Sequence, residues 1–136
     1  MELYKYNSNL KSVLQGPIEL KGAIAELKAI ASKGGDVFDD ETKAIPETSF
    51  TLSRSDSDWL EIATHSEGEI YFSSDRKIFD LSWFKKLFAS PSLQFQSSVE
   101  QAHYVISDYY SLSRAEFESK YSIGYTSKDS LYYAKI

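Results

Sequence analysis

Two histidines and their acidic neighbours are the residues of this 136-residue chain best suited to chemistry. His65 precedes Glu67 and Glu69, and alternate residues of a strand project to one side, so the three could in principle hold a metal ion. A zinc site needs about three ligands on rigid elements, whereas His65 falls in a predicted turn, and we predict no metal site and no cofactor. His103 lies next to the apolar stripe of a predicted helix, and this position favours a partly buried or capping histidine over a general base.

Standard catalytic and cofactor signatures are missing. The chain contains no G-x-S-x-G, H-E-x-x-H, P-loop or G-x-G-x-x-G pattern. It has no cysteine, which excludes a disulfide framework, a thiolate zinc site and a cysteine nucleophile. The run 75–77, Asp-Arg-Lys, could pair with an anion but also fits an ordinary charged turn. We predict that the protein is not an enzyme; an enzyme with clustered histidines or carboxylates in a cleft stays open as a third reading.

Acidic residues are concentrated in one segment. The net charge is −5, and residues 36–69 hold ten acids against two bases. This segment repels phosphate backbones and attracts basic partners, so we predict no nucleic-acid binding even though tyrosines alternate with lysines near the C-terminus. Acidic loops that keep a domain soluble would give the same composition.

The elements that must position these residues form one α+β domain spanning residues 1–136. An antiparallel meander over about 49–79 is indicated by three alternating runs joined by turn-forming residues. One face of it is apolar and should lie on helices. That inner face comprises Phe50, Leu52, Leu60, Ile62, Ile70 and Phe72.

Helices are expected on both sides of the meander in sequence. Apolar residues at helical spacing predict one over about 18–33, with Pro17 near its start and Gly34-Gly35 after it. Two to three helices should follow the meander: one around 81–90, and two opened by capping boxes at 97–100 and 113–116. Residues 2–6 and 131–136 fit short strands, and residues 11–15 are ambiguous.

The outer face of the meander is mixed and is the first place to look for function. Trp59 and Tyr71 should form a cross-strand aromatic pair beside Glu61. If no other element covers them, aromatics rimmed by acids make a protein-binding surface. The predicted partner-binding residues are Asp56, Asp58, Trp59, Glu61, Glu67, Glu69 and Tyr71.

The runs 58–62 (DWLEI) and 68–76 (GEIYFSSDR), followed by the predicted helix around 102–110, give the chain a resemblance to a known class. It resembles bacterial immunity proteins of polymorphic-toxin and contact-dependent-inhibition systems. That resemblance implies a binding protein without catalytic residues, whose acidic surface occludes a basic toxin domain with fast, salt-sensitive association.

The N-terminus has no signal-peptide pattern, and no stretch approaches the ~18 apolar residues of a membrane span, so we expect a cytoplasmic protein with no membrane partner. The alternative function is a small-molecule or regulatory binding domain with an aromatic-lined pocket between sheet and helices.

Overall fold

The computed structural model describes residues 1–9, 11–33, 48–64, 68–75, 92–121 and 134–135. Within these residues the chain forms seven strands and three helices. They are β1 (Glu2–Tyr6), β2 (Ser12–Pro17), α1 (Leu20–Lys33), β3 (Ser49–Ser55), β4 (Asp58–Thr64), β5 (Ile70–Asp75), β6 (Ser92–Ser97), α3 (Val99–Ser111), α4 (Arg114–Tyr121) and β7 (Ala134–Lys135).

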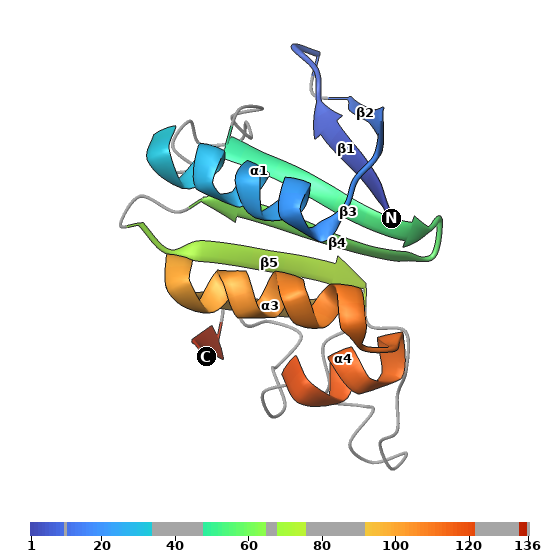
Figure 1. Ribbon diagram of the computed structural model, residues 1–136, viewed down its shortest axis with the longest axis vertical. Coiled ribbons are helices and arrows are strands. Elements are labelled where there is room, and N and C mark those ends of the chain that lie inside the picture. Colours follow the sequence, from blue (N-terminus) through green and yellow to red (C-terminus); the bar gives the residue numbers. More distant parts are fainter. Residues whose placement is uncertain (10, 34–47, 65–67, 76–91, 122–133, 136) are drawn as a thin grey trace.

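All seven strands belong to one sheet, in the order β2-β1-β3-β4-β5-β6-β7. Every neighbouring pair is antiparallel except β6 and β7, which are parallel. The helices α1 and α3 lie side by side on one face of this sheet (Figure 1). The predicted α+β class, with a meander packed against an N-terminal helix and C-terminal helices, is confirmed.

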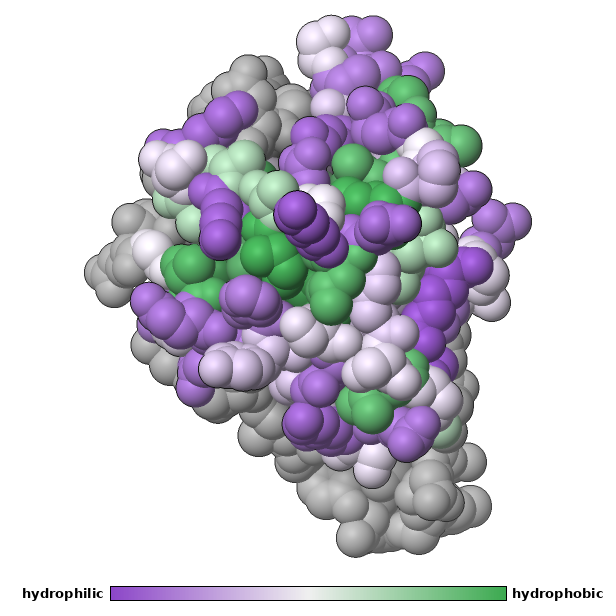
Figure 2. Space-filling view, in the orientation of Figure 1, coloured by the Kyte–Doolittle hydropathy of each residue, from purple (hydrophilic) through white to green (hydrophobic). Residues whose placement is uncertain are grey.

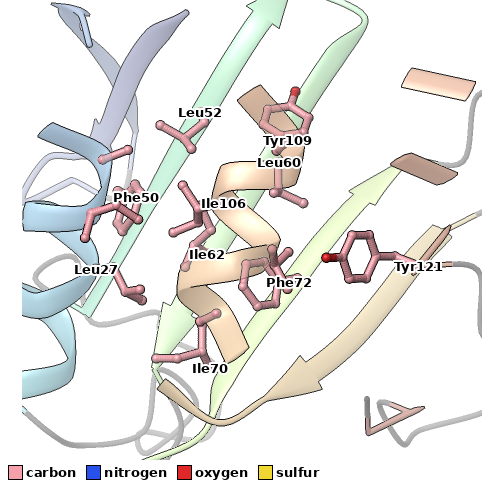
Figure 3. Packing of buried hydrophobic residues seen from close by; sticks show 14 of the residues in the cluster. Leu27, Phe50, Leu52, Leu60, Ile62, Ile70, Phe72, Ile106, Tyr109 and Tyr121 are labelled. Carbon is pink, nitrogen blue, oxygen red and sulfur yellow. The ribbon is translucent and has the colours of Figure 1, made fainter. Parts of the chain in front are cut away.

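One row of apolar side chains crosses the sheet and forms the centre of the core. Phe50 lies opposite Ile62, which lies opposite Phe72. Phe72 in turn lies opposite Phe95 of β6, and none of the four is more than 1% exposed. Figure 3 shows Phe50, Ile62 and Phe72 of this row with Leu27 of α1 and Ile106 of α3. The predicted inner face, completed by Leu52, Leu60 and Ile70, is fully buried.

The helices cover this face with amphipathic stripes. α1 buries Ala23, Ile24, Leu27 and Ile30, which recur at helical spacing. From the helix side, apolar side chains gather along the junction of α1 and α3, and hydrophilic side chains surround them (Figure 2). Because both helices pack on the inner face, the outer face lies on the opposite side of the sheet.

A run of aromatic rings joins α4 to the sheet. Phe95 stacks on Phe72 with 4.9 Å between ring centroids, and Tyr121 of α4 stacks on Phe95 at 5.1 Å. Phe117 lies 4.8 Å from Tyr121 and meets Tyr109 of α3 edge to face at 5.1 Å. These offset and edge contacts add to the burial energy of the rings, so the short helix α4 is held by its aromatics.

Arg114, the first residue of α4, anchors the same helix by charge. Its guanidinium donates to the Asp58 carboxylate at 3.0 Å, to Ser74 Oγ at 2.9 Å and to the Glu118 carboxylate at 3.2 Å. It also donates to the backbone oxygens of Trp59 and Asp75. Only 10% of the Arg114 side chain is exposed, so this planar group with its five donors links α4 to β4 and β5 in a largely dry setting.

A second arginine, Arg54 of β3, caps α3. It donates to the carbonyl oxygens of Tyr109 and Leu112, and its guanidinium lies 4.3 Å from the centre of the Tyr109 ring. The last turn of α3 has no basic residue of its own, so Arg54 supplies the cation that a helix C-terminus favours. The Tyr109 hydroxyl donates to Asp58 at 2.9 Å, and burial together with this carboxylate raises the pKa of Tyr109.

Several helix boundaries differ from the sequence predictions. The capping box at 113–116 is confirmed by reciprocal Ser113 and Glu116 hydrogen bonds. The box of α3 uses Ser98 and Gln101 instead of residues 97 and 100, because Ser97 still belongs to β6. α1 begins at Leu20, and Pro17 ends β2.

The remaining predictions of strands and helices agree with the structure only in part. Residues 92–97 form β6, for which no strand is predicted above, and residues 11–15 fall within or next to β2. The predicted strands at 2–6 and 131–136 correspond to β1 and, in part, β7, while the predicted helix around 81–90 lies outside the described residues. In the described part of the chain no helix is both long enough and apolar enough to cross a membrane.

Candidate binding site on the outer sheet face

The outer face is built from the strand residues that alternate with the core. Glu61 projects away from its buried neighbours Leu60 and Ile62, and lies opposite Thr51 of β3. Thr51 lies opposite Tyr4 of β1, so β1, β3 and β4 carry these three side chains in one lateral row. The pairing of an N-terminal strand with the meander thus brings tyrosines beside the predicted site.

A hollow of about 340 Å³ lies on this face. Among the described residues, three aromatic rings, two carboxylates and four small hydroxyl side chains line it, and none of these is basic. The lining residues are Tyr4, Tyr6, Ser12, Thr51, Ser53, Ser55, Asp56, Trp59 and Glu61. Trp59, Glu61 and both tyrosines are half-buried, while Asp56 is exposed at the turn between β3 and β4.

Glu61 is the most perturbed acid of the hollow. Burial raises its pKa, and a hydrogen bond from the Tyr6 hydroxyl opposes that rise without cancelling it. Burial also raises the pKa of Tyr6, and the nearby Glu61 charge raises it further. The Tyr4 hydroxyl donates to Glu2 at 3.4 Å, and burial followed by the Glu2 and Asp56 charges raises its pKa. Both tyrosines therefore stay neutral, and the hollow has a negative potential.

The structure gathers three of the predicted partner-binding residues, Asp56, Trp59 and Glu61, around this hollow. Tyr71 lies on the same face but is not among the described residues that line the hollow. The predicted Trp59–Tyr71 pair is wrong because Tyr71 lies opposite Ala63, while Trp59 lies opposite Ser53. Trp59 and Ala63 are four positions apart on β4, or roughly 13 Å along the strand.

The remaining predicted site residues lie elsewhere. The Asp58 carboxylate accepts from Tyr109 and Arg114 and pairs with Arg54 at 3.4 Å, so it serves the packing of α3 and α4. Asp58 lies two residues before Leu60 and four before Ile62, and this spacing places all three on the inner face. Glu69 is half-buried just before β5, and Glu67 lies outside the described residues.

Neither histidine is among the described residues that line the hollow. His103 is exposed on α3, beside the Tyr104 ring at 6.0 Å, so the expectation that it is partly buried or capping is wrong. It projects from the solvent side of an amphipathic helix. His65 lies outside the described residues, and no group of three or more potential metal ligands occurs among the residues that are described.

Tyr4, Tyr6 and Ser12 line the hollow but are not among the site residues predicted from sequence. They reach the hollow only because β1 pairs with β3, which follows it by more than forty residues, and because β2 pairs with β1. A pairing between strands so distant in sequence leaves no local pattern. The only available signal was the alternation of tyrosines in residues 2–6.

A second hollow, of about 540 Å³, lies between the end of β1 and the C-terminal half of α1. Most of its described lining residues are of polar type, and an ion pair of 2.8 Å between Lys5 and Glu26 joins the two elements there. Ser49 also lines it, with a buried Oγ that has no hydrogen-bond partner among the described residues. Of the described lining residues, Tyr6 is the one that both hollows share.

Comparison with known proteins leaves the geometry as the sole guide to function, because the chain matches no protein-family model, no curated protein and no solved structure.

Proposed function

We propose that the protein is a binding protein that neutralises a basic partner protein, in the manner of an immunity protein that occludes a toxin domain. The observation that carries this proposal is the half-buried Glu61 carboxylate in a hollow walled by Trp59, Tyr4 and Tyr6, with no base among the lining residues that the structure describes. Burial raises the pKa of Glu61, so its ionised form is unfavourable in the free protein. A cationic partner would supply a counter-charge for this carboxylate.

The arrangement suits recognition in two ways. Aromatic residues in a partly desolvated hollow are the residues that dominate binding energy at protein interfaces. The acids of residues 36–69, including Asp56 at the rim, would steer a basic partner toward the surface and make its association rate fall with salt. The aromatic contacts then set the dissociation rate, and the acids set the association rate.

Co-expression with the product of the adjacent reading frame tests the proposal. We expect a stable complex on size exclusion and rescue of growth from the partner's toxicity. The variant Trp59→Ala should weaken the complex by a factor of ten or more, as hot-spot truncations do. The control Glu100→Gln removes an exposed acid on the helix side, and should leave binding unchanged. Neither complex nor rescue with the intact protein would end the proposal.

A small-molecule binding domain is the second candidate, and the buried, unpartnered Ser49 Oγ in the polar hollow beside α1 is the observation that favours it. A polar ligand that fills this hollow should raise the melting temperature by mass action. The variant Glu26→Gln should diminish that shift, and a metabolite library that gives no shift with the intact protein would exclude this candidate.

A further inference from the structure

We propose that the outer-face hollow binds one guanidinium group, supplied by an arginine side chain of the partner. This inference rests on the proposed function and specifies the chemistry of the same site. It follows from the hydrogen-bonding state of the lining groups, from their charge and from their aromatic surfaces.

Three of the lining groups use their own protons inside the protein. The Tyr6 hydroxyl donates to Glu61, and the Tyr4 hydroxyl donates to Glu2. Ser53 Oγ donates to the carbonyl oxygen of Ser55 at 2.8 Å. These three oxygens keep free lone pairs, and the carboxylates of Glu61 and Asp56 can only accept when they are ionised. Five of the described lining groups therefore offer acceptors, and a ligand that brings several donors is complementary to them.

Positive charge is the second requirement. Two carboxylates and no base occur among the described lining residues, so an anion placed between these groups would be repelled. Glu61 is half-buried, and a cation placed beside it meets less screening by solvent than one on an open surface. A neutral donor could satisfy the hydrogen bonds but would leave this charge without a partner.

The aromatic rings distinguish a guanidinium from an ammonium. Trp59, Tyr4 and Tyr6 offer flat surfaces within the hollow, and a guanidinium is planar, weakly hydrated and able to stack on such rings while it donates in its plane. An ammonium has three donors and a stronger hydration shell, which the hollow would have to replace. The same stacking of an arginine on a ring occurs inside this protein, where Arg54 lies over Tyr109.

A titration of the isolated, full-length protein tests the inference without any partner. The probes are N-acetyl-arginine amide, N-acetyl-lysine amide and N-acetyl-citrulline amide, the last of which keeps the shape of arginine but is neutral. The readout is the NMR shift of the Trp59 indole N–H. For the arginine probe we expect saturable shifts with a Kd of about 1–10 mM, about three-fold weaker binding of lysine, and at least ten-fold weaker binding of citrulline.

Variants connect this binding to the proposed groups. Glu61→Gln keeps the size of the side chain and an oxygen that can accept from Tyr6, and we expect it to weaken arginine binding about ten-fold. Glu100→Gln, the control on the helix side, should leave it unchanged. Trp59→Leu, followed through backbone amide shifts and checked for folding by circular dichroism, should also weaken it several-fold.

Three results would overturn the inference: equal binding of citrulline and arginine, tighter binding of lysine than of arginine, or unchanged binding in Glu61→Gln. These results are independent of the co-expression experiment. Arginine binding without a complex would refute the partner proposal alone, whereas a complex together with equal citrulline binding would refute only the guanidinium site.

Discussion

Replacement of Arg114 by methionine should be among the most destabilising single substitutions in this protein. The guanidinium donates to two carboxylates, those of Asp58 and Glu118, and to Ser74 Oγ, all within 3.2 Å. The exposed fractions of the Arg114 and Glu118 side chains are 10% and 5%. Methionine has a similar length but no donors, so both carboxylates would lose this cation in a setting that water scarcely reaches.

Removal of one partner from a buried ion pair costs about 3–5 kcal/mol, which is a large part of the roughly 5–15 kcal/mol that stabilises a domain. Lys120, also in α4, provides the control. Its Nζ lies 2.7 Å from the Asp108 carboxylate, but 57% of its side chain is exposed. An exposed pair contributes less than about 1 kcal/mol, so burial and not distance decides the difference.

Urea unfolding followed by far-UV circular dichroism measures both changes. With a slope of about 2 kcal/mol per molar urea, Arg114→Met should lower the midpoint by about 2 M, and Lys120→Met by less than about 0.5 M. The double variant Arg114→Met/Asp58→Asn should lose less stability than the sum of the two single variants, because both changes remove the same ion pair. Equal midpoint shifts for the two single variants would refute the reasoning from burial.

Three further predictions concern stability. Burial raises the pKa of Glu61, so the folded state holds its proton to a higher pH than the unfolded chain, and Glu61 lowers stability as pH rises through that window. Tyr6, Tyr4 and Asp56 are the other titratable groups among the described residues that line the hollow. Glu61→Gln should raise the melting temperature at pH 7 by about 3 °C, a gain that shrinks in acid; calorimetry showing a loss at pH 7 would contradict this. Ser98→Ala removes the N-cap hydroxyl of α3 and should cost about 1 kcal/mol in urea unfolding, whereas Ser111→Ala, at the exposed other end of the helix, should cost much less. Phe95→Ala removes a fully buried ring stacked between Phe72 and Tyr121 and should cost about 3–5 kcal/mol; a loss under 1 kcal/mol would show that this stack is not part of the core.

The elements that could be predicted from sequence are those whose signal is local. α1 buries four apolar residues at helical spacing, and the inner face of β3 to β5 alternates strictly, so burial selects one face. The capping box of Ser113 and Glu116 is also a contact within four residues. In each case the residues that interact are close in sequence, so their spacing is enough.

What could not be predicted depends on register and on distant pairing. The sequence places Trp59 and Tyr71 on one face but does not set the offset between β4 and β5, and that offset separates them. The hollow needs Tyr4 and Tyr6, which reach it through β1 pairing with β3. The strand period alone places Asp58 on the inner face, because it lies two residues before Leu60. Its acidic character nevertheless suggested a surface role.

The order of the strands also has a consequence for how the protein opens. β1 and β2 form one hairpin, β3 to β6 form a continuous antiparallel block, and the two are joined through three register pairs, Glu2 with Ser53, Leu3 with Leu52 and Tyr4 with Thr51. Proteins open in cooperative units that follow such boundaries. In native-state hydrogen exchange the hairpin amides should therefore exchange at a lower free energy than those of β4 and β5. Two walls of the outer-face hollow belong to different units, so a ligand that spans them would slow exchange in the hairpin more than in the block.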